Sequence, residues 1–310
     1  MVEKDVVIQN HITKIENWVK CGGPEECEWD DFNQWIDALF DDKEKFEFTD
    51  KEIKAIQNAF GDSINVDTLQ GHTINKPYGY AGDFQLIDNF YTYNTLNKDK
   101  FIKFDHFGLN MRGADALRNR KSYFINLILS KINSNPNGML ILDVASGPCR
   151  NLKEFFELKP DYKIQCDCIE QDAKAIDYAK SILDGECKKV NFIQKNAIKF
   201  TTDKKYDLIW SGGLFDYFTD GIFVRLLKRY YNFLNDNGEM VIGNFSPNNP
   251  SKNYMALMEW HLNYRDEEKL MELARECDFD MNFVSIGKEP ENVNLFLHVK
   301  KNNFGIAKNL

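Results

Sequence analysis

The sequence of 310 residues contains no uninterrupted run of eighteen apolar residues, roughly the length that a membrane-spanning helix needs. It also lacks a positively charged start followed by an apolar stretch, the pattern of a secretory signal. Residues 1–20 read MVEKDVVIQNHITKIENWVK instead. We therefore expect a soluble, cytoplasmic protein without a membrane span.

Positive charge is in short supply. Lysine and arginine number 39 against 48 aspartates and glutamates, so the formal net charge is −9. Nucleic-acid-binding proteins usually present a concentrated basic face to the phosphates, and only a local patch around Arg112, Arg118, Arg120 and Lys121 is left for that role. We expect no nucleic-acid partner, and a small-molecule, lipid-like or peptide substrate instead.

Paired cysteine motifs are missing. The seven cysteines are an odd number without repeated CxxC pairs, so neither a zinc site nor a disulfide framework is indicated, and we expect no metal. We expect free, structural thiols. Cys166 and Cys168, two positions apart in an apolar run, are expected on one face of a buried strand.

The first part of the chain has helical spacing throughout. It is clear in ITKIENWVK, WDDFNQWIDALF and TDKEIKAIQNAFG, all within the first 70 residues. A further helix is expected in DFQLIDNFYTYN, with Asp83 as its cap, and a long one from about 110 to 131. The loop NSNPNG then closes the helical region.

From Met139 short apolar runs alternate with amphipathic helices. The runs are MLILDVA, KIQCDCIE, VNFIQKN, YDLIWSG, EMVIGNF, FVSIG and NLFLHVK. This alternation is typical of a parallel, doubly wound sheet, but the EPEN turn before the last run cannot hold a crossover helix. We predict an α/β fold with a doubly wound seven-stranded sheet, an antiparallel last hairpin and an N-terminal all-helical cap. The predicted parts are a cap or lid with the substrate-binding region over 1–134, the sheet domain over 135–300 and a tail over 301–310.

The first of these runs leads into DVASGPCRN. Asp143 ends the strand, and Ala145, Ser146 and Gly147 form a tight turn before the helix NLKEFFEL. Small residues let a ligand approach the backbone, and the amino end of a helix favours anionic groups. A dinucleotide site would have a third glycine where Arg150 stands, which argues against NAD.

Polar residues follow the next two strands. Glu170 ends the second run, where a carboxylate is placed to accept both ribose hydroxyls of an adenosine. Asn196 follows the third run, where an adenine edge would lie, with the backbone of Ala197 beside it. Taken alone, Asn196 is more often a turn residue than a ligand contact.

In this order the motifs resemble the class I methyltransferases that use S-adenosylmethionine. Residues 143–147 match the first motif of that family, with Ala145 in place of its usual first glycine and Cys149 in place of the third. YDLIWSGG at 206–213 matches the fourth-strand motif, which faces the transferred methyl group. The resemblance covers residues 139–300.

The resemblance implies S-adenosylmethionine as cofactor and S-adenosylhomocysteine as product. In it Glu170 is the ribose-binding acid and Asn196 lies near the adenine amine. From their place before the sheet, Arg118 and Arg120 are expected to hold either the substrate or the carboxylate of the cofactor's methionine, although a solvated or ion-paired surface role is at least as common for a single arginine; we assign Arg118 to the cofactor. The full set of expected cofactor contacts is Asp143, Ala145, Ser146, Gly147, Glu170, Gln171, Asn196, Ala197, Ser211 and Arg118.

A narrower resemblance runs along the whole chain. PYGYAGD at 77–83, the triplet at 118–120, SGGLFDYF at 211–218, and GNFSPNNP followed by YMALMEWHLNYR at 254–265 are similar to bacterial methyltransferases that make 3-hydroxypalmitic acid methyl ester. A weaker resemblance is to enzymes that methylate the carboxyl terminus of ribosomal peptides. Both imply O-methylation of a carboxylate on a fatty acid, small metabolite or peptide.

A carboxylate acceptor needs no general base, because its pKa of about 4 leaves it ionised at neutral pH. The candidate bases are Asp216 and Tyr217 after the fourth run and His261 in MEWHLNYR, and no histidine has a tightly paired acid nearby in the sequence. His261 is more often a packing or hydrogen-bonding residue. This favours positioning of the acceptor over proton abstraction.

A carboxylate does need a cationic clamp, and a guanidinium offers it two parallel hydrogen bonds. Arg265, after Trp260 and Tyr264, is the expected clamp, although a surface role is equally common for a single arginine. Asn244 either fixes the acceptor through its amide or caps the following turn. The apolar residues of 255–260 either line an acyl pocket or, more commonly at helical spacing, belong to a core.

PYGYAGD is expected to form an irregular lid over the cofactor pocket, with Tyr80 closing over the reacting atoms. The plainer alternative is a turn that packs two helices. Two rival functions stay open: methylation of a hydroxyl or amine in secondary metabolism, and a non-catalytic scaffold that keeps the cofactor pocket.

Overall fold

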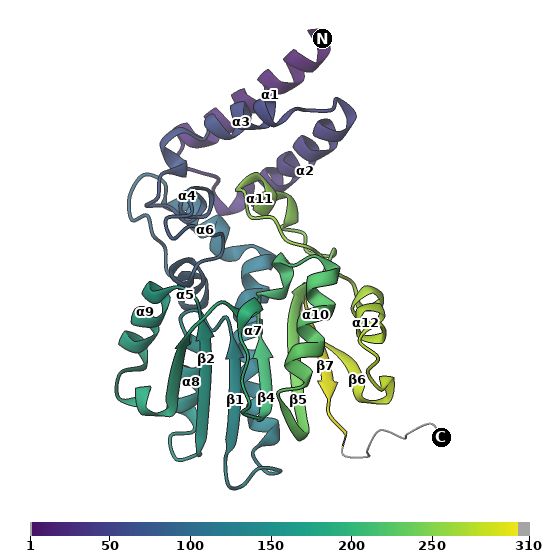
Figure 1. Cartoon of the computed structure of the whole chain (residues 1–310). Coiled ribbons are helices and arrows are strands. Elements are labelled where there is room, and N and C mark those ends of the chain that lie inside the picture. Colours follow the sequence, from purple (N-terminus) through teal and green to yellow (C-terminus); the bar gives the residue numbers. More distant parts are fainter. Residues whose placement is uncertain (1, 303–310) are drawn as a thin grey trace. The chain divides into compact units, whose positions relative to one another are not determined.

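The computed structural model describes residues 2–302, which form two compact units (Figure 1). Unit 1 comprises residues 2–115 and 250–261, and unit 2 comprises 116–249 and 262–302. The predicted tail lies outside the described residues from position 303 onward. Within 2–302, no helix combines the length and the apolar character that crossing a bilayer requires. The assignment of 1–134 to a substrate-binding cap stays a prediction.

Unit 1 is helical, as the spacing indicated. Its core is aromatic and includes Phe32, Trp35, Phe60 and Phe104, each buried. Its helices are α1 (Val2–Lys20), α2 (Trp29–Lys45), α3 (Asp50–Asn58), α4 (Leu69–Asn75), α5 (Phe84–Thr92), α6 (Ile102–Asn110) and α11 (Lys252–Leu257). The sequence did not indicate α4 and α6, because both are short and carry buried polar residues that obscure the apolar period.

The segment 250–261 returns the chain to unit 1 after the fifth strand of unit 2. Tyr254, Leu257 and Met258 pack into the aromatic core of unit 1, and Tyr254 Oη donates to Gln70 Oε1 at 2.9 Å. Met255 is also buried. These residues therefore belong to a core, the more common of the two alternatives for their spacing.

PYGYAGD joins α4 to α5 within unit 1. Asp83 caps α5 as predicted, since its Oδ1 accepts the backbone N–H groups of Gln85 and Leu86 at 3.0 Å each. Its Oδ2 lies 2.7 Å from His72 Nε2, and both side chains are buried. Tyr78 packs against Phe84, with ring centroids 4.6 Å apart and the ring planes tilted by 57°. The segment is thus held to both helices by its ends.

Unit 2 contains one seven-stranded sheet with the order β3-β2-β1-β4-β5-β7-β6. The strands are β1 (Met139–Val144), β2 (Ile164–Glu170), β3 (Val190–Gln194), β4 (Tyr206–Ser211), β5 (Leu234–Phe245), β6 (Val284–Lys288) and β7 (Asn294–Lys300). The first five are parallel, and β7 runs antiparallel between β5 and β6. The predicted fold class is confirmed, and the structure adds that β6 forms the edge.

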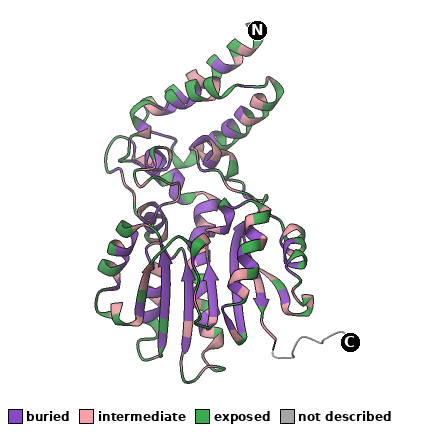
Figure 2. Ribbon diagram, in the orientation of Figure 1, coloured by how far each residue is buried: buried purple, intermediate pink, exposed green. Residues whose placement is uncertain are grey.

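Helices cover both faces of this sheet. On one face α7 (Arg112–Lys131), α8 (Arg150–Leu158) and α9 (Ala173–Leu183) pack on residues such as Ile141, Leu208 and Val241. On the other face α10 (Asp220–Tyr231) and α12 (Glu267–Glu276) pack on Leu142 and Ile209. Figure 2 shows the central strands as the most continuously buried part of unit 2. Strands covered on both faces are uniformly apolar, which explains runs such as MLILDV.

All seven cysteines are free, as predicted. Cys166 and Cys168 are fully buried with their sulfur atoms 3.6 Å apart, which places both on one face of β2. Cys149 Sγ lies 3.9 Å from Cys168 Sγ. Burial raises the thiol pKa of Cys166, so these thiols are structural.

Candidate functional site

The site in unit 2 lies where the strand order reverses. The chain leaves β1 for α8 on one face of the sheet and leaves β4 for α10 on the other. The carboxyl ends of β1 and β4 are therefore the switch point at which open α/β sheets commonly bind ligands, and we call this place the crevice. The register brings Asp143 of β1 beside Cys168 of β2 and Trp210 of β4. Ser211 Oγ donates to Val144 O at 3.1 Å, which ties the two strand ends together.

The loop after β1 has left-handed backbone at alternate residues. Ala145, Gly147 and Cys149 have φ values of 57°, 53° and 54°. Alternation of this kind turns successive N–H groups toward one point and is a common way of binding a ligand's polar groups. A Cβ built on Gly147 would meet no atom within 4 Å, so open space adjoins the loop there. Ser146 is buried, and its N–H donates to Ile169 O at 3.2 Å.

Glu170 links this loop to the end of β2. Its Oε2 accepts the N–H of Gly147 at 3.1 Å, and its Oε1 accepts those of Gln171 at 2.7 Å and Asp172 at 3.0 Å. A carboxylate has about four acceptor positions, so three N–H groups leave one for a ligand hydroxyl. Burial raises the pKa of Glu170, and the backbone donors oppose that rise.

Asp143 presents an acceptor that has no partner. It is 2% exposed, and its Oδ2 makes no hydrogen bond to any group within residues 2–302. Burial raises the pKa of Asp143 to about 7; the Asn151 side chain and the charge of Arg120 lower it, while the charge of Glu170 raises it. A buried, unpaired carboxylate oxygen beside an open loop suits a cationic or N–H-bearing ligand.

Arg120 reaches this crevice from α7. It is 8% exposed, and its Nη1 donates to Gly212 O at 3.2 Å, just after β4. Asp216 lies in the next turn, is 2% exposed, and accepts the N–H of Phe245 at 2.6 Å. Burial raises the pKa of Asp216 to about 6, against the lowering effects of that N–H and of the charges of Arg120 and Arg265.

The residues predicted at the adenine end lie together. Gln171 and Asn196 are exposed, and Asn196 Nδ2 donates to Gln171 Oε1 at 2.8 Å. Asn196 Oδ1 accepts the N–H of Ile198, and Ala197 O accepts the hydroxyl of Tyr230 at 2.9 Å. The turn role of Asn196 is therefore observed, and its cofactor contact stays a prediction.

Arg118 lies on α7 and is half-buried. Residues two positions apart on a helix point about 200° from each other. Because Arg120 points toward Gly212, Arg118 points to another side of α7. Its assignment to the cofactor stays a prediction, and Arg120 is the arginine that reaches the crevice.

Arg265 and Asn244 differ from what the sequence indicated. Arg265 is 3% exposed, with Nε and Nη2 on Asp220 Oδ1 at 3.0 and 2.8 Å and Nη1 on Asn244 Oδ1 at 2.8 Å. Asn244 is fully buried, and its Nδ2 donates to the carbonyls of Phe245 and Asn263. Inside unit 2 the Arg265 guanidinium therefore donates to the Asn244 amide oxygen, and both side chains donate to buried backbone carbonyls near the end of β5. With these partners, Arg265 is better suited to holding this loop in place than to binding a substrate carboxylate.

The other three predicted catalytic residues lie on more open segments. Tyr217 of unit 2 is 40% exposed. In unit 1 the side chain of His261 is 67% exposed, 3.6 Å from Glu259 Oε2, and Tyr80 is half-buried. Their roles stay predictions. The sequence considered Arg120 and Asp216 but did not select them, because nothing in the order of residues showed that the charge of Arg120 would act on both Asp143 and Asp216.

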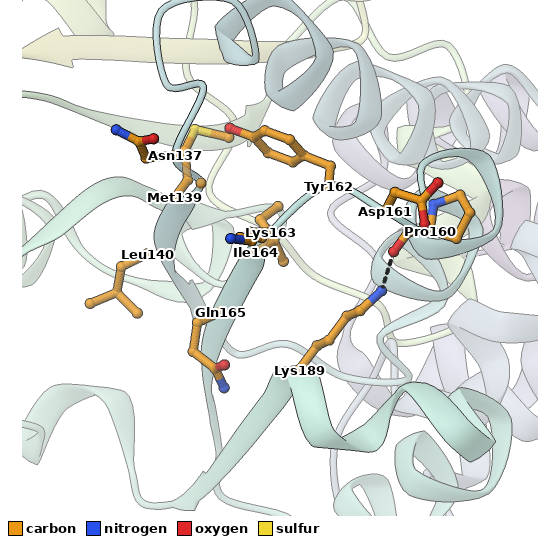
Figure 3. A pocket seen from close by; sticks show the side chains of 11 residues that line it. Asn137, Met139, Leu140, Pro160, Asp161, Tyr162, Lys163, Ile164, Gln165 and Lys189 are labelled. Atoms are coloured by element: carbon orange, nitrogen blue, oxygen red, sulfur yellow. Dashed lines mark hydrogen bonds between the residues drawn. The ribbon is translucent and has the colours of Figure 1, made fainter.

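A separate hollow of about 510 Å³ lies at the amino ends of β1 and β2, away from this site. Figure 3 shows Lys189 Nζ pointing to Pro160 O, at 2.9 Å, across its rim. Lys189 also pairs with Glu186 at 2.7 Å. The Lys189 ammonium group therefore already has a carbonyl and a carboxylate as partners. Among the described residues that line the hollow, none has a buried side-chain oxygen without a hydrogen-bond partner, whereas Asp143 at the crevice has one.

Residues 141–238 match a family model described as a methyltransferase domain. With the strand order and the reversed β7, this establishes a class I methyltransferase fold whose cofactor is S-adenosylmethionine. The open space at Gly147, the one remaining acceptor position of Glu170 and the unpaired Asp143 Oδ2 fit a ribose hydroxyl and the amino group of that cofactor.

One relative is malonyl-[acyl-carrier protein] O-methyltransferase 1 of Ilyobacter polytropus, 27% identical over 154 residues. The alignment covers 50% of this chain and 51% of the relative, so the chain spans about half of the length of the protein that it matches.

Many solved structures are similar to this chain, among them the following two. A possible exported protein from Bordetella parapertussis has a TM-score of 0.57 at 16% identity, covering 71% of this chain and 79% of that chain. Magnesium protoporphyrin IX methyltransferase from Synechocystis PCC 6803, with bound S-adenosylhomocysteine, has a TM-score of 0.48 at 8% identity, covering 62% and 87%. The first likeness is one of fold alone.

Replacing Asp143 by asparagine changes how stability depends on pH. The native state keeps the proton of Asp143 up to a pKa of about 7, whereas an unfolded aspartate loses it near 3.9. Between these values the native state binds more protons, so its stability falls as pH rises. As pH rises from 5 to 8, the free energy of unfolding of Asp143→Asn should therefore increase relative to that of wild type by on the order of 2–3 kcal/mol. Urea unfolding of the cofactor-free proteins at pH 5 and pH 8 measures this change. The same difference in unfolding free energy between mutant and wild type at both pH values would contradict the prediction.

Replacing Glu170 by glutamine should weaken binding of S-adenosylhomocysteine by roughly 10–100-fold. The new NH₂ group would oppose a backbone N–H group and remove a charged acceptor for the ribose. Calorimetric titration measures the affinity. Glu157→Gln, an exposed glutamate of α8, is the matched control and should bind like wild type. An affinity of Glu170→Gln within twofold of wild type would remove Glu170 from the site.

Proposed function

We propose that this protein transfers the methyl group of S-adenosylmethionine to a carboxylate oxygen and so forms a methyl ester. The observation that carries methyl transfer is the cradle of Asp143, Gly147 and Glu170 inside the segment that matches the methyltransferase family. The relative from Ilyobacter polytropus supports an oxygen acceptor, since it is named for methylating an oxygen of a malonyl group. The acceptor is a fatty acid, a small metabolite or a peptide carboxyl terminus.

The cofactor, when bound, supplies a methyl group on a positively charged sulfur. A new bond from the acceptor oxygen to the methyl carbon forms as the carbon–sulfur bond breaks, and the sulfur keeps the bonding electron pair. An ionised carboxylate has no proton to lose at this step, so the protein has only to orient the acceptor and exclude water. Rigid loops at the ends of β4 and β5, held by Asp216, Asn244 and Arg265, provide that orientation.

Cell extract incubated with the protein and isotopically labelled S-adenosylmethionine tests this proposal. We expect one labelled product class that releases labelled methanol in mild alkali, as methyl esters do. Palmitate, 3-hydroxypalmitate and a short peptide with a free carboxyl terminus serve as defined acceptors. A label that survives alkali would contradict the ester, and binding of S-adenosylhomocysteine without any transfer would support the scaffold reading instead.

Asp216 favours a second candidate, methylation of a hydroxyl or amine. Such an acceptor must lose a proton, and a buried carboxylate with a pKa near 6 at the end of β4 is suited to take it. The ionised form of Asp216 would then be required, so activity would fall as pH drops below about 6.

Asp216→Asn separates the two candidates. Asparagine keeps an oxygen that can accept the N–H of Phe245, so the loop is preserved. For a carboxylate acceptor we expect a wild-type rate that varies little between pH 5 and 7 and an Asp216→Asn kcat within about tenfold of wild type. For a base-assisted reaction kcat would drop by roughly 10²–10⁴-fold. Single-turnover rates measure this, because they isolate methyl transfer from product release.

A further inference from the structure

The turn after β3 is held by side chains of α10. This turn is η4 (Ala197–Lys199), and it lies where the edge of the adenine base is expected. Tyr230 Oη donates to Ala197 O at 2.9 Å, and Arg229 Nη1 donates to Ile198 O. Both carbonyl groups therefore point toward α10. A ligand that needs an acceptor from this turn would have to compete with these two donors.

Tyr230 is firmly placed for this role. It is fully buried in the core of unit 2, and its ring packs almost perpendicular to that of Phe233, with centroids 5.7 Å apart. Burial raises the pKa of Tyr230, so the hydroxyl keeps its proton at neutral pH and acts as a donor. Arg229, the preceding residue, is half-buried and supplies the second donor. The position of η4 is thus set by the packing of α10 on the sheet.

The N–H groups of the same turn include one that is not used. Asn196 Oδ1 accepts the N–H of Ile198 at 2.9 Å, and Asn196 O accepts that of Lys199 at 3.0 Å. Within residues 2–302, the N–H of Ala197 has no hydrogen-bond partner. Across a trans peptide the C=O and the N–H point in opposite directions. Since Asn196 O points into the turn, the N–H of Ala197 points out of it, and the turn offers a ligand a donor.

We propose that Tyr230 and Arg229 are positioning residues that set the base selectivity of the cofactor site. By holding the carbonyl groups of η4 on α10, they leave the N–H of Ala197 as the backbone group that meets the base. Adenine carries an unprotonated nitrogen, N1, beside its amino group, whereas hypoxanthine carries an N–H at that position. A donor that faces a second donor leaves both N–H groups unpaired, which is costly. The site should therefore prefer adenine to hypoxanthine.

Calorimetric titration with S-adenosylhomocysteine and S-inosylhomocysteine, which differ only in the base, tests this proposal. Tyr230→Phe keeps the ring and removes the hydroxyl, and Arg229→Met keeps an unbranched side chain and removes its donors. Tyr206→Phe is the matched control. Tyr206 is also fully buried, and its hydroxyl donates to Asp167 Oδ2 at 2.8 Å, at the start of β4. Each variant loses a side-chain donor, but only the first two lose it at η4.

We expect wild type to bind S-adenosylhomocysteine about tenfold or more tightly than S-inosylhomocysteine. In Tyr230→Phe and Arg229→Met a carbonyl group of η4 is released and can turn to the base. Affinity for S-adenosylhomocysteine should then fall by about 3–10-fold, while that for S-inosylhomocysteine stays the same or rises. The ratio of the two affinities is the decisive measurement, because a general loss of stability lowers both affinities alike. Tyr206→Phe should keep the wild-type ratio.

A wild type that binds both ligands equally would overturn the proposal, and so would a wild-type ratio in both Tyr230→Phe and Arg229→Met. A ratio that changes as much in Tyr206→Phe would also overturn it, because the effect would not belong to η4. A change in one of the two variants alone assigns the role to that residue. Should Tyr230→Phe fail to fold, Arg229→Met carries the comparison.

These outcomes are separate from those of the proposed function, because the proposal concerns the base of the cofactor and not the methyl acceptor. An alkali-stable methyl product would contradict ester formation and leave the base selectivity untouched. An unchanged affinity ratio in both variants would overturn the role of Tyr230 and Arg229 and leave ester formation standing.

Discussion

One buried arginine acts on two buried carboxylates at the strand crevice of unit 2, and the loops around it are arranged to keep that charge in place. Burial alone favours the protonated forms of Asp143 and Asp216, and the charge of Arg120 opposes this in both. Gly212 and Gly213 lack side chains where the guanidinium lies. Charge and backbone shape at the end of β4 thus depend on the same residue.

Several polar side chains at the strand ends make hydrogen bonds to backbone groups of the neighbouring loops. Glu170 accepts three N–H groups and so sets the shape of the loop after β1. Arg265 and Asn244 satisfy carbonyls and each other at the end of β5. Buried polar groups that lack partners are costly, so a site rich in exposed loop backbone requires such residues around it. Their rigidity is what a reaction based on positioning needs.

Unit 1 relies on the same principle in its own loops. Asp105 is fully buried and accepts the N–H groups of Leu69, Leu96 and Asn97 at 2.7–2.8 Å. Asp83 combines a helix cap with its pair to His72. PYGYAGD is therefore a braced connection between α4 and α5, which agrees with the plainer of its two interpretations. Its role as a lid stays a prediction.

The sequence alone was sufficient for the seven strands, the parallel sheet with its reversed hairpin, and the cap at Asp83, because these depend on local periodicity and on short-range hydrogen bonds. It also placed Asp143, Glu170 and Ser211 at the carboxyl ends of their strands, and strand ends align in a parallel sheet. It could not tell whether an arginine near a strand end would face a ligand or its neighbours. Arg265 turned inward to Asn244 and Asp220, while Arg120, from a helix before the sheet, reached the crevice. Those directions depend on contacts between residues that are 21 to 92 positions apart, such as Arg120 with Gly212, which only the tertiary structure brings together.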